Sequence, residues 1–403
     1  MKKAPDPIFG IRSFCDGAGG RGRTGTVSLP RDFESRTSAN SITPACLSYS
    51  SILSQVEGLN QGYWEIMGKF VGSSDRLHAG RKEWYSRLIG IVLEGWIIMR
   101  EILRECIRIG KEETKFGKVA EYIPELEKGN KEDVGIAIMD LEGTCHGEGE
   151  YLKNFTLQSI TKVTALLLAL EDKGKEEIFR HVHMEPTGDP FNSIMSFEVK
   201  NPEKPFNPMI NAGAMVVTSL IAGRDKEEKM KRILAFSDIL TGHPGTTYDE
   251  RVYHSEKETG HRNRSLAYFM KSTGIMQGSP EEILDLYFMQ CSILGNCRDI
   301  ATIGAILASN GIHPVTRQRV VRKENARIVK TVMTTCGMYD ASGEFAVSCG
   351  IPAKSGVGGG ILGAVPGAFG VGVFGPSLDK KGNSIAGIKM LEYLSRELDL
   401  SIF

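Results

Sequence analysis

The sequence predicts an α+β fold, and three features carry that prediction. Val134 to Leu141 is apolar and β-like, and Thr144 to Glu148 returns after a short turn, which is the pattern of a hairpin. Near the other end, Ile361 to Val365 and Phe369 to Phe374 are short β runs broken by glycines. Helical patterns fill residues 212 to 334 between them. Strand material at both ends that encloses a helical block indicates a two-part architecture.

Apolar residues recur at helical spacing in six segments of that middle block. We also expect a helix over residues 82 to 113, which the glycine at position 117 ends, and a last helix from Ser384 to Leu398. The six middle segments are Ala214 to Ala222, Glu227 to Ile239, Arg264 to Thr273, Pro280 to Ser292, Arg298 to Ser309 and Lys323 to Cys336.

The first 80 residues differ in composition from the rest of the chain. Residues 1–80 are rich in Gly, Ser, Arg and Thr and show no sustained period, so we expect a low-complexity, disordered N-terminal extension. Residues 81–403 are expected to form one domain. Its sheet-containing part would come from residues 115–165 and 335–403, and its helical part from about 166–334.

Composition limits the class of protein. The chain has 403 residues, 41% of them hydrophobic, and its 49 basic residues balance 49 acidic ones. This balance gives no electrostatic support for a nucleic-acid or membrane partner and suits a small neutral substrate. The eight cysteines include no CxxC pair, so we expect reduced thiols, no metal site and a cytoplasmic protein. The first residues lack the apolar run of a signal peptide, and charges interrupt the apolar segment Arg87 to Leu103.

Ser159 and Lys162 form the first candidate for chemistry. Apolar residues from Ile160 to Leu170 recur at helical spacing and predict a buried helix whose first turn carries both side chains on one face. A serine hydroxyl needs a base to take its proton, and a lysine among leucines can be that base because burial disfavours its charged form. The pair alone occurs often by chance, and a capping serine beside a solvated lysine is the commoner outcome. Its weight therefore comes from motifs further along the chain.

Five motifs occur together in one order along the chain: QSITK at 158–162, NPMINAGA at 207–214, HRN at 261–263, CGMY at 336–339 and PAKSGV at 352–357. Through these motifs the chain from about residue 85 to its end resembles the serine-dependent glutaminases. The resemblance implies the serine β-lactamase and transpeptidase-like fold, with an antiparallel sheet flanked by helices plus an all-helical subdomain. It implies hydrolysis of L-glutamine to L-glutamate and ammonia through a serine acyl-enzyme, with no cofactor, in a homo-oligomer that is a dimer or tetramer.

The resemblance also implies roles for particular residues. Ser159 matches the nucleophile, Lys162 its base partner, and Tyr339 the tyrosine that shuttles the serine proton. The backbone N–H of Val357 would join that of Ser159 in the oxyanion hole, and Tyr122 is expected among the catalytic residues. Contacts with the substrate are expected from Gln158, Asn211, Glu256, Asn263, Tyr287, Tyr339 and Val357.

Physical chemistry adds two expectations to these roles. A free amino acid must have both of its charges met, and Glu256 is the best candidate for the ammonium. Lys354, next to Ser355 at a glycine-rich strand end, would add positive potential that lowers the pKa of Tyr339. The substrate carboxylate would accept neutral hydrogen bonds from Asn211, Asn263 and Tyr287.

Two features depart from the family pattern. Residues 1–80 resemble nothing in the family, which leaves their role open. The long animal enzymes carry a C-terminal ankyrin region, whereas this chain ends at Phe403, as in the bacterial short form.

Rival interpretations have weaker support. Residues 358–363 satisfy GxGxxG, with Asp379 about 20 residues on, but a glycine-broken β pattern follows where a dinucleotide fold needs a helix. His181-Val182-His183 has no third metal ligand at suitable spacing. On the same fold, the alternative is a penicillin-binding or sensor-type protein acylated at Ser159, or a β-lactamase. The polar side chains expected to bind an amino acid favour the glutaminase.

Overall fold

The structure is a computed structural model that describes residues 97–188, 190, 192–193 and 203–403. The expected N-terminal extension, residues 1–80, lies outside the described residues, and so does the beginning of the helix expected over residues 82–113. The described part of that helix spans residues 97–113. Within the described ranges, no helix has the length and apolar composition needed to cross a bilayer.

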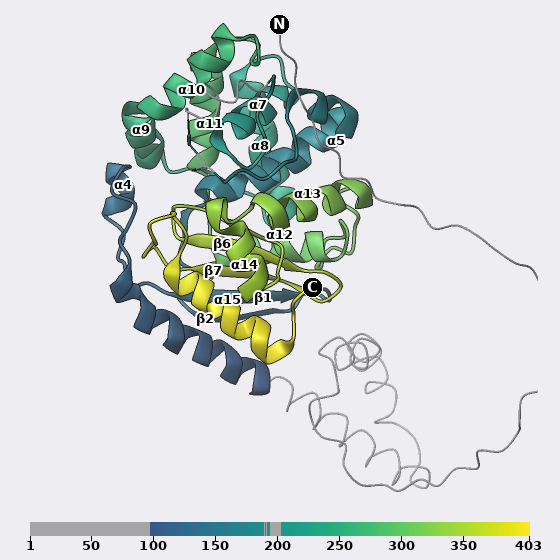
Figure 1. Ribbon diagram of the computed structural model, residues 1–403. Helices are drawn as coiled ribbons and strands as arrows, with labels where there is room; N and C mark the ends of the chain where they lie inside the picture. Colours follow the sequence, from purple (N-terminus) through teal and green to yellow (C-terminus); the bar gives the residue numbers. More distant parts are fainter. Residues whose placement is uncertain (1–96, 189, 191, 194–202) are drawn as a thin grey trace, which may run out of the picture. The chain divides into compact units, whose positions relative to one another are not determined.

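A five-stranded antiparallel sheet joins the two ends of the described chain (Figure 1). The expected hairpin is present as β1 (Gly135–Asp140) and β2 (Cys145–Gly149). The C-terminal β runs form β5 (Ala353–Ser355), β6 (Gly360–Val365) and β7 (Phe369–Phe374). The strand order is β2-β1-β7-β6-β5, so β1 pairs directly with β7. This sheet and the helices around it confirm the predicted α+β class.

Both faces of the sheet are covered, which explains why β1 is buried at every position. Successive side chains of a strand point to opposite faces, and Ile136 belongs to one hydrophobic cluster while Ala137 belongs to another. The cluster of Ile136 includes side chains from the helix at 97–113 and from α15 (Ile385–Leu398). The cluster of Ala137 includes side chains from α12 (Cys297–Ala308).

The position of α12 differs from the simplest division of the chain. It falls within residues 166–334, the range expected for the helical part, yet it packs against β7, β6 and β1. Every described side chain from Asp299 to Ala308 is buried, because the sheet lies on one side of α12 and other helices on the other. Periodicity identifies a helix but does not say which layer it joins.

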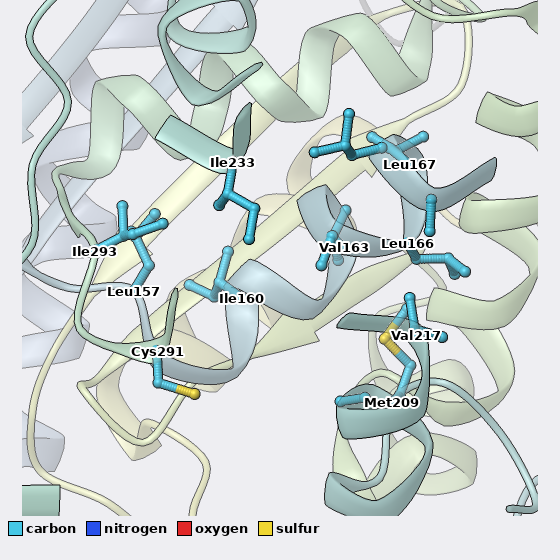
Figure 2. Packing of buried hydrophobic residues seen from close by; sticks show 14 of the residues in the cluster. Leu157, Ile160, Val163, Leu166, Leu167, Met209, Val217, Ile233, Cys291 and Ile293 are labelled. Carbon is cyan, nitrogen blue, oxygen red and sulfur yellow. The ribbon is translucent and has the colours of Figure 1, made fainter. Parts of the chain in front are cut away.

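The helices at 211–220, 226–241 and 323–336 pack against α5, whose first ten residues are all buried, and the remaining long helices of the helical part pack against these or against one another. Figure 2 shows Val163 and Leu166 of α5 among Met209, Val217 and Ile233 from neighbouring segments. The helices are α5 (Thr161–His181), α7 (Asn211–Leu220), α8 (Lys226–Thr241), α9 (Glu250–Thr259), α10 (His261–Ser272), α11 (Pro280–Cys291) and α13 (Lys323–Cys336). The short elements are η2 (Thr114–Phe116), α4 (Pro124–Glu127), β3 (Phe155–Thr156), η3 (Gln158–Ile160), β4 (Leu294–Gly295), η4 (Tyr339–Ala341) and α14 (Ser342–Ser348).

The α9 helix has no counterpart among the predicted helices. It buries only Val252, Tyr253 and Glu256, and just one of these is aliphatic. An apolar stripe of helical period is therefore missing from its sequence. Local signals do exist, since Asp249 caps its first turn by accepting hydrogen bonds from the N–H groups of Arg251 and Val252.

The glycines of β7 let α12 lie directly on the sheet. A Cβ atom added at Gly370 would stand 2.0 Å from the carbonyl oxygen of Ala301 and 2.1 Å from the amide nitrogen of Ala305. A Cβ atom at Gly304 of α12 would stand 2.2 Å from the carbonyl oxygen of Gly363. These contacts involve backbone atoms of both elements, which cannot move aside alone. The glycine-broken β pattern at 369–374 is therefore a helix-packing surface.

We expect Gly370→Ala to lower the free energy of unfolding by about 3 kcal/mol, because the new methyl group overlaps backbone atoms of α12. Urea denaturation measures the change. Gly343→Ala is the matched control, since Gly343 is exposed in α14 and a Cβ atom there meets nothing within 4 Å. Equal stability of the two variants would contradict the close packing of α12 on β7.

Candidate active site

Ser159 lies in a tight turn between β3 and α5. The turn is the 3-10 segment η3, and Gln158 within it has a φ of 50°. Ser159 is therefore just before α5, whereas we expected it in the first turn of the helix with Lys162. The difference has a local cause, because the backbone N–H of Leu157 donates to the carbonyl oxygen of Ile293 at 2.8 Å. This bond ties the turn to the segment that follows α11. Ser159 is 6% exposed.

The turn between β5 and β6 lies against this segment and brings Val357 beside Ser159. Glycines on both sides of Val357 make the contact possible. A Cβ atom at Gly356 would stand 2.5 Å from the carbonyl oxygen of Leu157, and one at Gly358 would stand 2.3 Å from that of Thr156. Two segments nearly 200 residues apart thus share one backbone interface.

Lys162 is enclosed at the start of α5. It is 1% exposed, and its Nζ donates to Asn211 Oδ1 at 2.7 Å and to the carbonyl oxygen of Met209 at 3.0 Å. Burial lowers the pKa of Lys162 to about 8, although the nearby Glu256 acts in the opposite direction. A substantial fraction of neutral amine is therefore present near neutral pH.

Tyr339 stands next to Ser159 in η4, with a φ of 56°. Its hydroxyl donates to the carbonyl oxygen of Ser355 at 3.1 Å. Burial raises the pKa of Tyr339, and a side-chain hydrogen bond with Ser159 opposes that shift. The phenol is therefore protonated in the resting protein.

The expectation that Lys354 lowers the pKa of Tyr339 is wrong. The Nζ of Lys354 does lie 4.4 Å from the centre of the Tyr339 ring. However, Lys354 is completely buried and donates to the carbonyl oxygens of Gly337 and Ser355 at 3.1 and 2.5 Å. Burial lowers the pKa of Lys354 well below its usual range, and the burial of Tyr339 itself raises the pKa of Tyr339.

Glu256 of α9 presents an unusual carboxyl group. Its Oε2 is buried and has no hydrogen-bond partner among the residues that the structure describes. Burial raises the pKa of Glu256 to about 8, while a hydrogen bond from Gln158 and the charge of Lys162 act to lower it. A buried oxygen without a partner costs stability, so such groups need an explanation.

Three polar side chains from separate helices form a connected chain beside Lys162. Asn211 at the start of α7 donates from Nδ2 to Asn263 Oδ1 at 2.9 Å. Tyr287 of α11 donates from its hydroxyl to Asn211 Oδ1 at 3.3 Å, the atom that also accepts from Lys162. These contacts could not be predicted from sequence spacing, because Asn211 and Tyr287 are 76 positions apart in the chain.

One pocket collects most of the site residues expected from the sequence. Tyr122 lies at its mouth with 57% of its surface exposed, Thr259 and Arg262 are also exposed, and the other lining residues are buried or half-buried. Lys162 and Tyr339 do not line this pocket and sit behind Ser159. The expected lining residues are Tyr122, Gln158, Ser159, Asn211, Glu256, Asn263, Tyr287 and Val357.

Sequence reasoning missed several lining residues. Arg262 was visible only as the middle of the HRN motif, and its Nε donates to the carbonyl oxygen of Asn192 at 2.8 Å. Cys291 ends α11, and the sequence predicted only a reduced thiol there. The remaining ones are Ile123, Asn192, Thr259 and Gly260.

Comparison with known proteins gives one consistent result. A family model described as glutaminase matches residues 117–403. Glutaminase 2 of Clostridium perfringens is 57% identical over 305 residues, which are 76% of this chain and 100% of the relative. A glutaminase of Clostridium botulinum is 55% identical over 305 residues, again 76% and 100% of the two chains.

Solved structures agree. The crystal structure of a probable glutaminase of Bacillus subtilis has a TM-score of 0.71 and 38% identity, covering 75% of this chain and 96% of that one. A Bacillus subtilis glutaminase in covalent complex with 5-oxo-L-norleucine, formed by reaction with 6-diazo-5-oxo-L-norleucine, has a TM-score of 0.69 and 38% identity. The match covers 75% of this chain and 98% of that chain.

The raised pKa of Glu256 predicts a pH-dependent stability. Folding keeps the carboxyl protonated between about pH 4.5 and pH 8, where the unfolded chain has lost the proton, so stability falls as the pH rises through that range. We expect Glu256→Gln to gain stability relative to the wild type by on the order of 2–4 kcal/mol from about pH 5 to about pH 8. Urea denaturation at several pH values measures this gain. Glu258→Gln, an exposed change on the same helix, should show no such trend, and a constant difference for Glu256→Gln would refute the prediction.

Proposed function

The chain belongs to the glutaminase family, whose members hydrolyse L-glutamine to L-glutamate and ammonia, and we propose that it does so through a covalent acyl-enzyme on Ser159. One observation carries the assignment of the site. The pocket that contains Ser159 also contains Glu256, whose buried carboxyl oxygen Oε2 has no partner in the described part of the chain. A nucleophile and an unmatched acidic group in one pocket fit a substrate with an amide at one end and an ammonium at the other.

The proton of Ser159 requires a relay. In our proposal the hydroxyl of Tyr339 accepts that proton as Ser159 attacks the carboxamide carbon and passes its own proton to the neutral amine of Lys162. When the C–N bond breaks, the proton held by Lys162 returns through Tyr339 to the departing nitrogen. A lysine with a pKa of about 8 can accept a proton near neutral pH. Because burial keeps the phenol of Tyr339 protonated, its proton is available for the departing ammonia. Water then attacks the acyl-enzyme, and the same groups return the proton to Ser159.

The tetrahedral intermediate carries a negative oxygen that needs hydrogen-bond donors. We assign this role to the backbone N–H groups of Ser159 and Val357. The support is geometric, since the glycines at 356 and 358 hold Val357 against the segment before Ser159, and both residues line the pocket. Backbone donors fixed in this way need no reorganisation as charge develops.

The remaining polar groups would hold the amino acid. Glu256 would accept from the α-ammonium, which supplies the partner that its Oε2 lacks. Asn211, Asn263 and Tyr287 would donate to the α-carboxylate, and Gln158 and Tyr122 would close the pocket around the side chain. These amino-acid contacts do not suit a β-lactam, and the penicillin-binding and β-lactamase alternatives are not favoured.

We also propose three broader properties. The family resemblance supports a homo-oligomer, either a dimer or a tetramer, and the reduced thiols expected from the sequence support a cytoplasmic location. The division into an N-terminal extension at 1–80 and a catalytic domain at 81–403 stays a prediction. It is supported by the helix at 97–113, which contributes Met99 and Leu103 to the core beneath the sheet.

The purified protein should release ammonia from L-glutamine and leave nitrocefin intact. It should also be inactivated by 6-diazo-5-oxo-L-norleucine, which reacts covalently with the Bacillus subtilis relative. Mass spectrometry of peptides should find the added mass on Ser159. Ser159→Ala should take up no label, and label on another residue, Cys291 in particular, would overturn the assignment of the nucleophile.

Ser159→Ala, Lys162→Ala and Tyr339→Phe should each lower kcat by about 10³ or more, because they remove parts of one proton relay. The double variant Lys162→Ala/Tyr339→Phe should be scarcely worse than either single change, since groups that act as a unit fail together. Steady-state kinetics measures both effects. Tyr339→Phe is the sharpest test because it removes one hydroxyl and little volume. If that variant kept more than about a tenth of wild-type kcat, Tyr339 would not carry the proton.

A further inference from the structure

A second cluster of charged side chains lies outside the pocket, at Asp285 of α11. Its carboxylate is 9% exposed. Lys257 of α9 donates to Asp285 Oδ1 at 2.6 Å, and Lys226 of α8 donates to Oδ2 at 2.5 Å. The hydroxyl of Tyr253, also on α9, donates to Oδ1 as well. One buried carboxylate therefore joins three helices.

The two α9 members of this cluster flank Glu256. Tyr253 and Lys257 are one turn apart and share a helix face, and Lys257 also donates to the Tyr253 hydroxyl at 3.0 Å. Glu256 directly precedes Lys257 in the same helix, so the position of its Cα atom depends on how Tyr253 and Lys257 are fixed. Val252 is the one buried aliphatic side chain of α9, so hydrogen bonds and ion pairs carry much of its attachment to its neighbours.

The other side of the pocket belongs to the helix that carries Asp285. Tyr287 lies two residues further along α11 and lines the pocket opposite the contribution of α9. The distance between Glu256 and Tyr287 therefore depends on how α9 is fixed to α11. A carboxylate that must meet an ammonium needs that distance to be set within a fraction of an ångström.

We propose that Asp285 is a positioning residue for substrate binding: through Tyr253 and Lys257 it fixes α9 so that Glu256 meets the α-ammonium of the substrate. This inference rests on the proposed role of Glu256. Hydrogen bonds from Lys226, Lys257 and Tyr253 outweigh the burial of Asp285 and lower its pKa to about 2. The carboxylate of Asp285 is therefore ionised at neutral pH.

The helices offer matched variants for the test. Tyr253→Phe removes one hydroxyl from the α9 connection and leaves the charge unchanged. Lys257→Met removes an ion pair between α9 and Asp285, and Lys226→Met removes an ion pair to the same carboxylate from α8. The two lysine variants change the net charge equally, but only the first loosens α9. Loss of a positive charge near the pocket would by itself favour an ammonium, so it cannot explain weaker binding.

We expect Tyr253→Phe and Lys257→Met to raise KM for L-glutamine about fivefold or more with kcat within about twofold, because ground-state and transition-state binding are lost together. Lys226→Met should leave KM within about twofold of the wild type. Inhibition constants supply a second measurement. L-glutamate should bind more weakly to the two α9 variants, whereas glutarate, which lacks the ammonium, should bind as it does to the wild type.

Several outcomes would overturn the inference. An unchanged KM in both α9 variants with a lowered Tm would make the network purely structural. An equal rise of KM in Lys226→Met would mean that α9 is not specifically involved, and an equal loss of glutarate affinity would indicate a general distortion of the pocket. Glu256→Gln is the reference variant. If it binds L-glutamine normally, both the ammonium assignment and this inference fail, whereas a raised KM in Glu256→Gln alone rejects only the inference.

Discussion

The close contact between the β5–β6 turn and the segment before α5 underlies the whole arrangement. Gly356 and Gly358 lie so near the carbonyl oxygens of Leu157 and Thr156 that no side chain fits between them. This contact joins the sheet to the first turn of the helical part. It also brings Val357 and Ser159, from opposite ends of the domain, to one wall of the pocket. The oxyanion site that we propose exists only because two backbones approach without side chains.

A second constraint is the burial of ionisable groups around that contact. Three ionisable side chains there are nearly inaccessible to solvent: Lys162, Lys354 and Glu256. Burial lowers the pKa of both lysines and raises that of Glu256, which in each case favours the neutral form. Such groups reduce stability unless another molecule or a proton compensates them. Burial disfavours the charged form of Lys162, which costs stability. In the proposed mechanism the same effect is useful, because it favours the neutral amine that can accept a proton.

The helical part also contains a buried carboxyl group whose pKa is lowered, that of Asp285. Glu256 and Asp285 are both buried carboxyls, but burial raises the pKa of Glu256 to about 8 whereas three donors lower that of Asp285 to about 2. The first group is left for a ligand, and the second is fully used inside the protein. Polar contacts, more than apolar burial, connect α9 to its neighbours, so the geometry of the pocket depends on residues that never touch the substrate.

Much of this protein follows from sequence by itself. Apolar periodicity identified the β1–β2 hairpin, the C-terminal strands and most long helices, because burial on a regular element leaves a regular pattern. The resemblance carried by five ordered motifs identified the family and eight of the residues that line the pocket, but other lining residues such as Arg262 and Cys291 were missed. Periodicity failed for α9, whose single buried aliphatic residue leaves no stripe, and for the layer to which α12 belongs.

Tertiary structure decided the rest. The sequence shows Lys354 near Tyr339 but not its complete burial, and so it led to the wrong direction for the pKa of Tyr339. The surroundings of the Glu256 carboxyl group come from several helices, and among the described residues they leave its Oε2 without a partner. The hydrogen bonds around Asp285 likewise join three helices. The pKa values of these groups depend on how far solvent is excluded and on the distances to other charges. Both quantities arise only when folding brings distant residues together, so no local pattern in the sequence contains them.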